Sequence, residues 1–382
     1  MSTTLQWSQV HAWHLGQHGL APRFPAGAIV QAVRRTCGIQ AQVMSAAELA
    51  ICTRVQGLRP QEVASALWCE RTLVKTWTMR SGTLHLLAAR DLALYVAARR
   101  FLDETHAWAN YFAYYGLTPA QQEAFLSAVP QVLGREPLTR QQLAEALVRQ
   151  TGIAQLRDLI LASSWGTPLK PSAFRGDLCF GPTRGQMVTF VNPRAWPDEW
   201  QSFEPEQAMR EIVRRYLRAY GPATPEDFAR WWWGGKGKVS ARRLFRDLAE
   251  ELAEVEVEGW QAFALRATLG SMLGCEAAYT AEQVRLLPLF DAYTIGMPRD
   301  REPLLALAHK AQVFRPQGWI SAVVLVNGSV QGVWHATSRR SQTIVRVHLF
   351  RSPPTSAVRT GIESEVERLR DFFARDVLLE MA

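Results

Sequence analysis

The segment Leu58-Arg-Pro-Gln-Glu-Val-Ala-Ser-Ala-Leu-Trp68 recurs twice, in degenerate form, farther along this chain. The second copy is Leu138-Thr-Arg-Gln-Gln-Leu-Ala-Glu-Ala-Leu-Val148, and the third is Ala223-Thr-Pro-Glu-Asp-Phe-Ala-Arg-Trp-Trp-Trp233. Each copy opens with a helix signal, a threonine at the N-cap position or a proline at the first helical position, and continues with apolar residues at helical spacing. Three copies that start roughly 80 residues apart indicate a repeated structural unit, because such repetition rarely arises by chance.

A pair of short alternating segments follows each copy and predicts a β-hairpin. The pairs are 75–80 with 83–87, joined by the two-residue turn Ser81-Gly82; 177–180 with 186–190; and 255–257 with 260–265, around Gly259. A helical turn precedes the first pair, and helical patterns at 156–164 and 239–250 precede the others. Helices followed by a hairpin, three times over, predict three tandem winged-helix domains, which we place at residues 1–115, 116–200 and 201–275.

Residues 276–382 have a different pattern, which predicts a sheet. Strand-like runs at 319–326, 330–335 and 343–350 surround the turn Asn327-Gly328, and an amphipathic helical pattern runs from Ile362 to Leu379 after the break at Pro353-Pro354. We therefore expect a β-barrel-like domain or curled sheet with a C-terminal helix, and an α+β fold class for the whole chain.

The composition favours a polyanionic partner and a reducing compartment. The 382 residues include 43 Lys and Arg against 35 Asp and Glu, a net charge of +8. The N-terminal residues lack a basic and apolar leader pattern, and no stretch approaches the ~20 apolar residues that span a bilayer. Five scattered cysteines without a C-x-x-C spacing predict neither a disulfide framework nor a zinc site. We expect a soluble cytoplasmic protein that associates with the nucleoid, without a metal or other cofactor.

The segment Gly38-Ile39-Gln40-Ala41-Gln42 places two amides two residues apart, ahead of a helical pattern that starts near Ser45. A neutral amide donates and accepts hydrogen bonds at once, so the pair could hold a water or a sugar without ionising. The other interpretation is a polar loop that enters a helix. The spacing alone does not separate the two.

Four blocks in order resemble a known family. They are Ala32–Gln42, Trp77–His85, Leu287–Tyr293 and Asn327–Trp334, and together they resemble the AlkZ/YcaQ-type bacterial DNA glycosylases. The resemblance implies three winged helices arranged as a C around a DNA channel, buttressed by a C-terminal β-barrel. It also implies hydrolysis of the N-glycosidic bond of alkylated purines, including bulky adducts and interstrand crosslinks. The Gln-x-Gln motif resembles the AlkZ branch, whereas Ser81, between Arg80 and Gly82, departs from the family's Arg-Gly-Thr-x-His form.

A cationic purine explains how neutral glutamines could suffice. Such a base leaves without a general acid, and the sugar passes through an oxocarbenium-like state. The protein then needs to hold a water near C1′ and to supply partial negative charge toward the sugar. Our hypothesis is that Gln42 positions the water, while Gln40 orients it or contacts the deoxyribose. Unmodified purines should then be spared.

Other residues are candidates for DNA contacts or for support of the site. Arg80 and His85 could reach phosphate or the lesion from the first hairpin, although His85 is equally typical of a half-buried strand residue. Asp291 and Tyr293 fit a supporting role, in which a buried carboxylate holds a loop. The remaining candidates for duplex contacts are basic residues beside the second hairpin and at the start of the helical pattern in the third repeat: Arg175, Arg184, Lys236, Lys238, Arg242 and Arg243. The last four are as compatible with a solvated basic loop.

Trp231, Trp232 and Trp233 are more typical of a core than of a stacking platform. A run of three cannot face one side of a helix, so we expect one ring to be exposed.

Two other functions are compatible with winged helices. A transcriptional regulator usually needs one such module and an effector domain, whereas three non-identical modules suit a protein that wraps a duplex. A non-catalytic lesion-binding protein would have the same sequence pattern as the enzyme. We expect a monomer whose partner is double-stranded DNA containing alkylated purines.

Overall fold

The computed structural model describes residues 3–102, 105–164, 166–196, 200–275, 282–340, 342–351 and 353–381. The chain divides into two compact units: unit 1 comprises residues 1–64 and 213–382, and unit 2 comprises residues 65–212. The boundaries between them fall inside α4 (Pro60–Trp68) and α12 (Pro205–Tyr220). Our division into four domains is finer than this partition and stays a prediction.

All three copies of the repeated segment are helical, as predicted: α4, α9 (Arg140–Thr151) and α13 (Pro225–Trp233). Thr139 and Thr224 cap their helices, each accepting a backbone N–H three residues on at 3.2 Å. A further helix follows the second and third copies, α10 (Gln155–Ala162) and α14 (Lys238–Asp247), whereas α4 leads into its hairpin without one. The first repeat is therefore the most divergent.

A β-hairpin follows each copy, as predicted. The strands are β3 (Leu73–Trp77) with β4 (Leu84–Ala88), β6 (Cys179–Arg184) with β7 (Met187–Val191), and β8 (Leu252–Val257) with β9 (Trp260–Leu265), all antiparallel. The predicted two-residue turn in the first hairpin was wrong, because Met79–Gly82 forms one helical turn, α5. Gly82 has a positive φ of 83° and its backbone approaches Phe174 so closely that a Cβ would lie 2.6 Å from the ring. The conformation of the segment between β3 and β4 therefore depends on packing against Phe174 as well as on the length of the segment.

Unit 2 has a core of aromatic and aliphatic side chains. Trp77 of β3 contacts Phe180 of β6 edge-on, with ring centroids 4.6 Å apart, and Phe190 of β7 closes the group. The other elements of unit 2 are η1 (Ala89–Asp91), α6 (Leu92–Arg99), α7 (Thr105–Tyr114), α8 (Pro119–Val132), β5 (Leu138–Thr139), η2 (Thr167–Leu169), α11 (Lys170–Phe174) and η3 (Pro193–Ala195).

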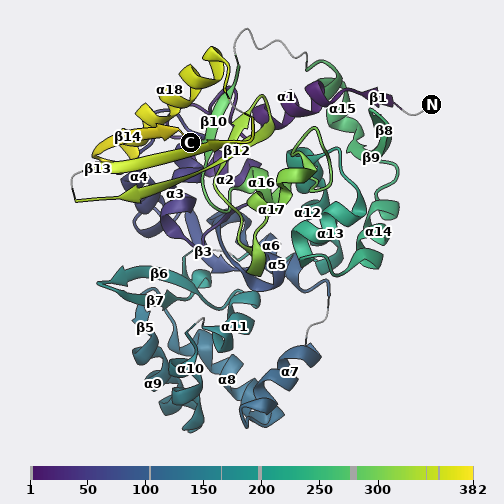
Figure 1. Ribbon diagram of the computed structural model, residues 1–382. Helices are drawn as coiled ribbons and strands as arrows, with labels where there is room; N and C mark the ends of the chain where they lie inside the picture. Colours follow the sequence, from purple (N-terminus) through teal and green to yellow (C-terminus); the bar gives the residue numbers. More distant parts are fainter. Residues whose placement is uncertain are drawn as a thin grey trace. The chain divides into compact units, whose positions relative to one another are not determined.

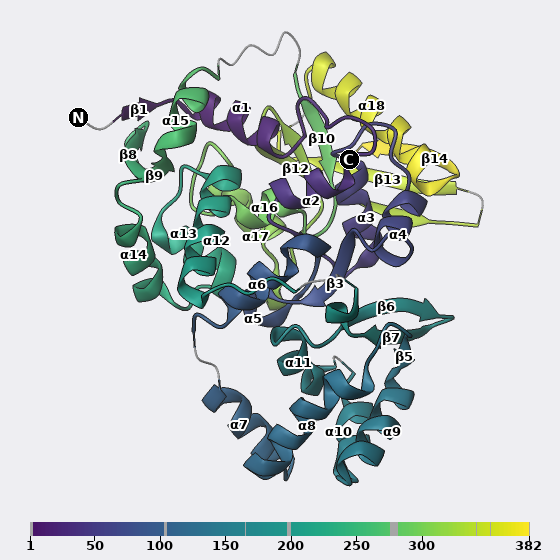
Figure 2. The same ribbon diagram turned by 180° about the vertical axis from the view of Figure 1, so that it is seen from behind.

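In unit 1, the N-terminal strand β1 (Thr3–Leu5) pairs in parallel with β8, so the third hairpin becomes a three-stranded sheet. The helices α1 (Trp7–Gln17) and α15 (Arg266–Leu273) lie beside this sheet, with α12, α13 and α14 nearby (Figure 2). Trp231, Trp232 and Trp233 are all buried, so our expectation of an exposed ring was wrong. Trp231 packs on the tyrosines of α12, and Trp233 covers the backbone of Gly237, because partners surround α13 on several sides.

The C-terminal part of unit 1 is a curled five-stranded sheet (Figure 1). Its order is β10 (Val284–Leu287), β11 (Val323–Val326), β12 (Ser329–Ser338), β13 (Gln342–Leu349) and β14 (Asp376–Met381), so among the described strands it is open, with β10 and β14 at its edges. The predicted helix is α18 (Ser356–Phe373), but its expected end was wrong: it stops before Ala374, which has a φ of 50°, and β14 follows. Residues 376–381 pair in parallel with β13, which fixes them as a strand.

Both faces of this sheet are buried. Val324 and Val326 of β11 face Ile362 and Val366 of α18, whereas the alternate residues of β11 belong to the core shared with α1 and β8. The remaining elements of unit 1 are α2 (Ile29–Arg35), β2 (Ile39–Gln40), α3 (Met44–Cys52), α16 (Ala292–Gly296), η4 (Leu307–His309), α17 (Lys310–Val313) and η5 (Pro316–Gly318). Among the described residues, no helix combines the length and the apolar character that crossing a membrane requires.

Candidate active site and its comparison with known proteins

The glutamine pair follows a sharp reversal of the chain at the end of α2. Thr36 ends the helix, and the next two residues, Cys37 and Gly38, have φ values of 56° and 98°. Their N–H groups donate to Arg34 and Val33 carbonyls at 3.1 and 2.9 Å, which closes the end of the helix. The short strand β2 then delivers Gln40, and α3 begins two residues after Gln42.

The two glutamines differ in exposure and are bonded to each other. Gln40 is 5% exposed, whereas Gln42 is exposed. The Gln40 Nε2 donates a hydrogen bond to the Gln42 Oε1. A carbonyl oxygen has two lone pairs, so Gln42 retains one acceptor position for a further donor such as water. The pair thus presents one outer amide whose orientation is set by an inner one.

A tyrosine from α12 holds the turn that leads to the glutamines. The Tyr220 hydroxyl donates to the Thr36 carbonyl at 2.8 Å, and both residues are buried. Burial raises the pKa of the Tyr220 phenol well above its usual value, so the group stays protonated and acts as a donor.

An ion pair holds the segment that follows the glutamines. Arg54, just beyond α3, donates to both carboxylate oxygens of Asp291 at 2.7 and 2.8 Å, and neither side chain is exposed. Arg54 also donates to the Ala50 carbonyl of α3 at 2.8 Å. Asp291 caps α16 through the Tyr293 N–H at 2.9 Å, and the Tyr293 hydroxyl donates to the Gly328 carbonyl at 2.7 Å. Asp291 and Tyr293 therefore lie within a buried network at the C-terminal end of α3.

Three candidates for DNA contacts in unit 2 are held by protein partners. His85 of β4 is 3% exposed, and its Nδ1 lies 3.0 Å from the Thr83 carbonyl oxygen; burial lowers its pKa to about 3, so it is neutral. Arg175 pairs with Glu123 at 3.2 Å, and Arg184 on β6 donates to Gln142 at 3.3 Å.

Arg80 lies in the helical turn α5 with a φ of 54° and is half-buried. The structure therefore places all four of these residues in unit 2 and the glutamine pair in unit 1.

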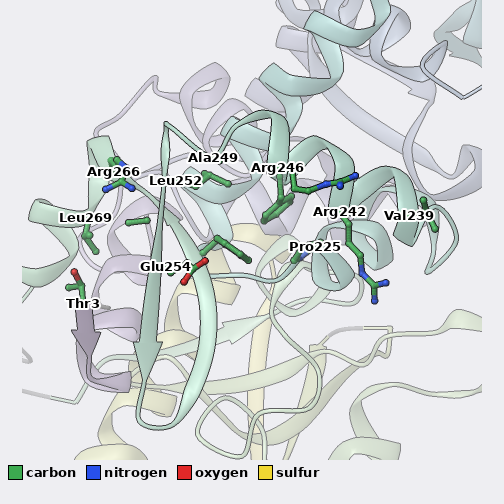
Figure 3. A pocket seen from close by; sticks show the side chains of 13 residues that line it. Thr3, Pro225, Val239, Arg242, Arg246, Ala249, Leu252, Glu254, Arg266 and Leu269 are labelled. Carbon is green, nitrogen blue, oxygen red and sulfur yellow. The ribbon is translucent and has the colours of Figure 1, made fainter. Parts of the chain in front are cut away.

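The basic candidates of the third repeat lie on α14 or just before it, and one of them lines a groove in unit 1. Lys236 and Lys238 are exposed at the start of α14, and Arg243 is exposed on the helix itself. Arg242 pairs with Glu226 at 2.6 Å and lines the groove, which has a volume of about 850 Å³. Figure 3 shows Arg242 and Arg246 on one side of the groove and Arg266 on the other, with Glu254 between them. The lining therefore carries more positive than negative charge.

Among the described residues, no group of three or more His, Cys, Asp or Glu side chains is arranged to hold a metal ion.

Residues 33–372 match the protein family described as DNA glycosylase AlkZ-like. The chain belongs to this AlkZ-like DNA glycosylase family. It is therefore a hydrolase of N-glycosidic bonds in DNA, as the resemblance of the four sequence blocks predicted, and the rival interpretation as a transcriptional regulator is set aside.

Two comparisons with proteins of Streptomyces sahachiroi, one by sequence and one by structure, support the assignment to the AlkZ-like family. The sequence relative is named interstrand DNA cross-link repair glycosylase and is 38% identical over 333 residues, 86% of this chain and 87% of the relative. The solved structure is that of the DNA glycosylase AlkZ, which matches with a TM-score of 0.85 and 33% identity over 100% of both chains. The α+β fold of this AlkZ-like chain is therefore that of AlkZ.

Sequence reasoning missed the residues that support the glutamines of this AlkZ-like protein, namely Thr36, Arg54 and Tyr220. Arg54 carries a weak signal, because it is a charged residue in an otherwise apolar stretch. Tyr220 carries none, because its partner is 184 positions away.

Proposed function

We propose that this AlkZ-like glycosylase excises cationic purines alkylated at N7 or N3 from duplex DNA, and that Gln42 holds the attacking water. The supporting observation is the bond from Gln40 to the carbonyl oxygen of Gln42, an exposed residue, which leaves that oxygen one further acceptor position. A water that donates to this oxygen is held with its own lone pair available for C1′. Gln40 acts on the water through Gln42.

The proposed chemistry uses no general acid. An alkylated purine carries its positive charge as a leaving group and departs neutral, so the barrier lies in stabilising the oxocarbenium-like sugar. The amide carbonyl supplies partial negative charge toward that sugar without the cost of burying a carboxylate. His85, buried and neutral, is not needed as a proton donor in this scheme.

We further propose that bulky adducts and interstrand crosslinks are substrates, because a relative with 38% identity is named for crosslink repair. In this proposal, three winged helices, arranged as a C, contact the duplex through basic side chains. These are Arg80, Arg175 and Arg184 in unit 2, and Lys236, Lys238, Arg242 and Arg243 in unit 1. The repair would take place in the cytoplasm at the nucleoid, with the protein as a monomer and without a cofactor.

Excision of N7-methylguanine from a duplex tests the proposal. Purified protein is incubated with the duplex, and abasic sites are revealed by cleavage in alkali. We expect Gln42→Ala and Gln40→Ala to lower the single-turnover rate by roughly 100-fold or more, as removal of one positioned polar group does in other active sites. Gln261→Ala is the matched control, since Gln261 is an exposed glutamine of unit 1 that bonds only Glu256 among the described side chains. Unchanged excision by both glutamine variants would overturn the assignment.

A further inference from the structure

We propose that Tyr220 is a positioning residue for the glutamine pair: its hydroxyl fixes the Thr36 carbonyl and thereby the turn that delivers Gln40. The proposal rests on the catalytic roles proposed for Gln40 and Gln42. Tyr220 bonds the backbone of the turn at Thr36 and would act on the glutamines through it.

The Thr36 carbonyl is a position where one hydrogen bond controls the direction of the chain. Carbonyl groups at a helix end lack intrahelical donors, so their orientation depends on other partners. Here the partner is the Tyr220 hydroxyl at 2.8 Å, in a buried site where Thr36 is 0% and Tyr220 is 2% exposed. The two residues after Thr36 have positive φ, a conformation that costs energy at Cys37 and needs support from its surroundings. Without the tyrosine bond, the peptide between Thr36 and Cys37 loses its outside support.

The Tyr220 ring is held rigidly enough to serve as such a support. The backbone of Gly296 in α16 lies against one side of the ring, so that a Cβ at this glycine would overlap it. His18 contacts the ring edge-on, with centroids 5.0 Å apart, and Trp231 packs at 5.9 Å. A ring confined in this way keeps its hydroxyl in one place, and small displacements of catalytic groups have large effects on rate.

The same helix offers a matched control. Tyr216 lies one turn before Tyr220 in α12 and is 0% exposed. Its hydroxyl has no hydrogen-bond partner among the described residues. Tyr216→Phe therefore removes a buried phenolic oxygen that tethers no loop, whereas Tyr220→Phe removes one that does.

The experiment measures single-turnover excision of N7-methylguanine and the Kd for the same duplex. We expect Tyr220→Phe to slow excision roughly ten-fold or more and to change the Kd by less than about two-fold. Loss of the tyrosine bond displaces the turn and with it the glutamines, whereas the side chains that contact DNA keep their positions. Tyr216→Phe should excise within about two-fold of the parent chain. In a Gln42→Ala background, Tyr220→Phe should slow excision further by less than about two-fold, since both changes remove the same function.

Other outcomes overturn the inference. One is an excision rate for Tyr220→Phe equal to that of Tyr216→Phe, and the other is an equal slowing by Tyr220→Phe with and without Gln42. Either result excludes action through the glutamines. If Gln40→Ala and Gln42→Ala excise normally, the proposed function fails first and the inference with it. Should Tyr220→Phe fold poorly, 4-aminophenylalanine at this position, which restores a donor, must recover the rate; failure to recover it counts against the hydrogen bond.

Discussion

Arg54 and Asp291 stand 237 positions apart in the chain and form a doubly hydrogen-bonded ion pair that is fully buried. One partner follows α3, the helix that begins just after the glutamine pair, and the other caps α16. The pair therefore ties the N-terminal segment that carries the proposed site to the C-terminal part of unit 1.

Breaking this pair should be costly, because removal of one partner leaves a buried charge uncompensated. We expect Asp291→Ala to lower the free energy of unfolding by about 3–5 kcal/mol, measured by urea denaturation. Glu380→Ala is the control: it breaks the exposed pair with Arg346 and should cost less than about 1 kcal/mol. Equal losses in the two variants would contradict a structural role for the buried pair.

The charge of the lesion should decide which bases are excised. Duplexes that contain N7-methylguanine, its neutral ring-opened derivative or unmodified guanine differ mainly in leaving-group charge. We expect rapid release of N7-methylguanine alone, because neutral amides offer no acid to protonate the other two bases. Chromatography of the freed bases measures the release. Release of the ring-opened base at a comparable rate would require a proton donor and would count against the proposed chemistry.

Acid should destabilise the protein through buried histidines. Burial lowers the pKa of His14 to about 4, although its bonds with the Gly221 and Tyr220 backbone oppose this shift. Between pH 6.5 and 4 the unfolded chain binds a proton that the folded chain excludes, so stability falls as the pH falls. Over the interval from pH 6.5 to 5 this one group should cost about 2 kcal/mol.

The contribution of His14 can be isolated by substitution. The stability of His14→Gln, measured at both pH values, should fall less on acidification than that of the parent chain. Gln261→Ala, at an exposed side chain that carries no titratable group, is the control and should leave the pH dependence of the parent chain unchanged. Parallel pH profiles for His14→Gln and the parent chain would show that His14 does not titrate in this way.

Lys236 and Lys238, at the start of α14, should contribute to the salt dependence of DNA binding. We expect the double variant Lys236→Gln with Lys238→Gln to reduce the slope of log K against log salt concentration by about 2, since each phosphate contact contributes roughly 0.9. Lys310→Gln with Arg346→Gln removes equal charge from side chains already paired with carboxylates. If both double variants change the slope equally, net charge and not the position of the lysines governs binding.

Local patterns predicted most of the elements. The threonine caps at 139 and 224 and the apolar spacing behind them define α9 and α13, and alternating residues define β9 over the same range as the structure. The misses lie where distant contacts override local preference. Residues 376–379 continue a helical pattern but pair with β13, and the turn at Met79–Gly82 packs against Phe174 at Gly82.

The sequence by itself determined the repeated helices and hairpins, the family of the protein and the position of the two glutamines, because each depends on residues that are close in the chain. Only the tertiary structure decided which glutamine is buried, which is exposed, and what holds them. Tyr220 reaches Thr36 across 184 positions and Asp291 reaches Arg54 across 237. Such bonds have no local signature. A buried polar group needs a hydrogen-bond partner, but the residues near it in the chain do not identify which distant residue supplies that partner.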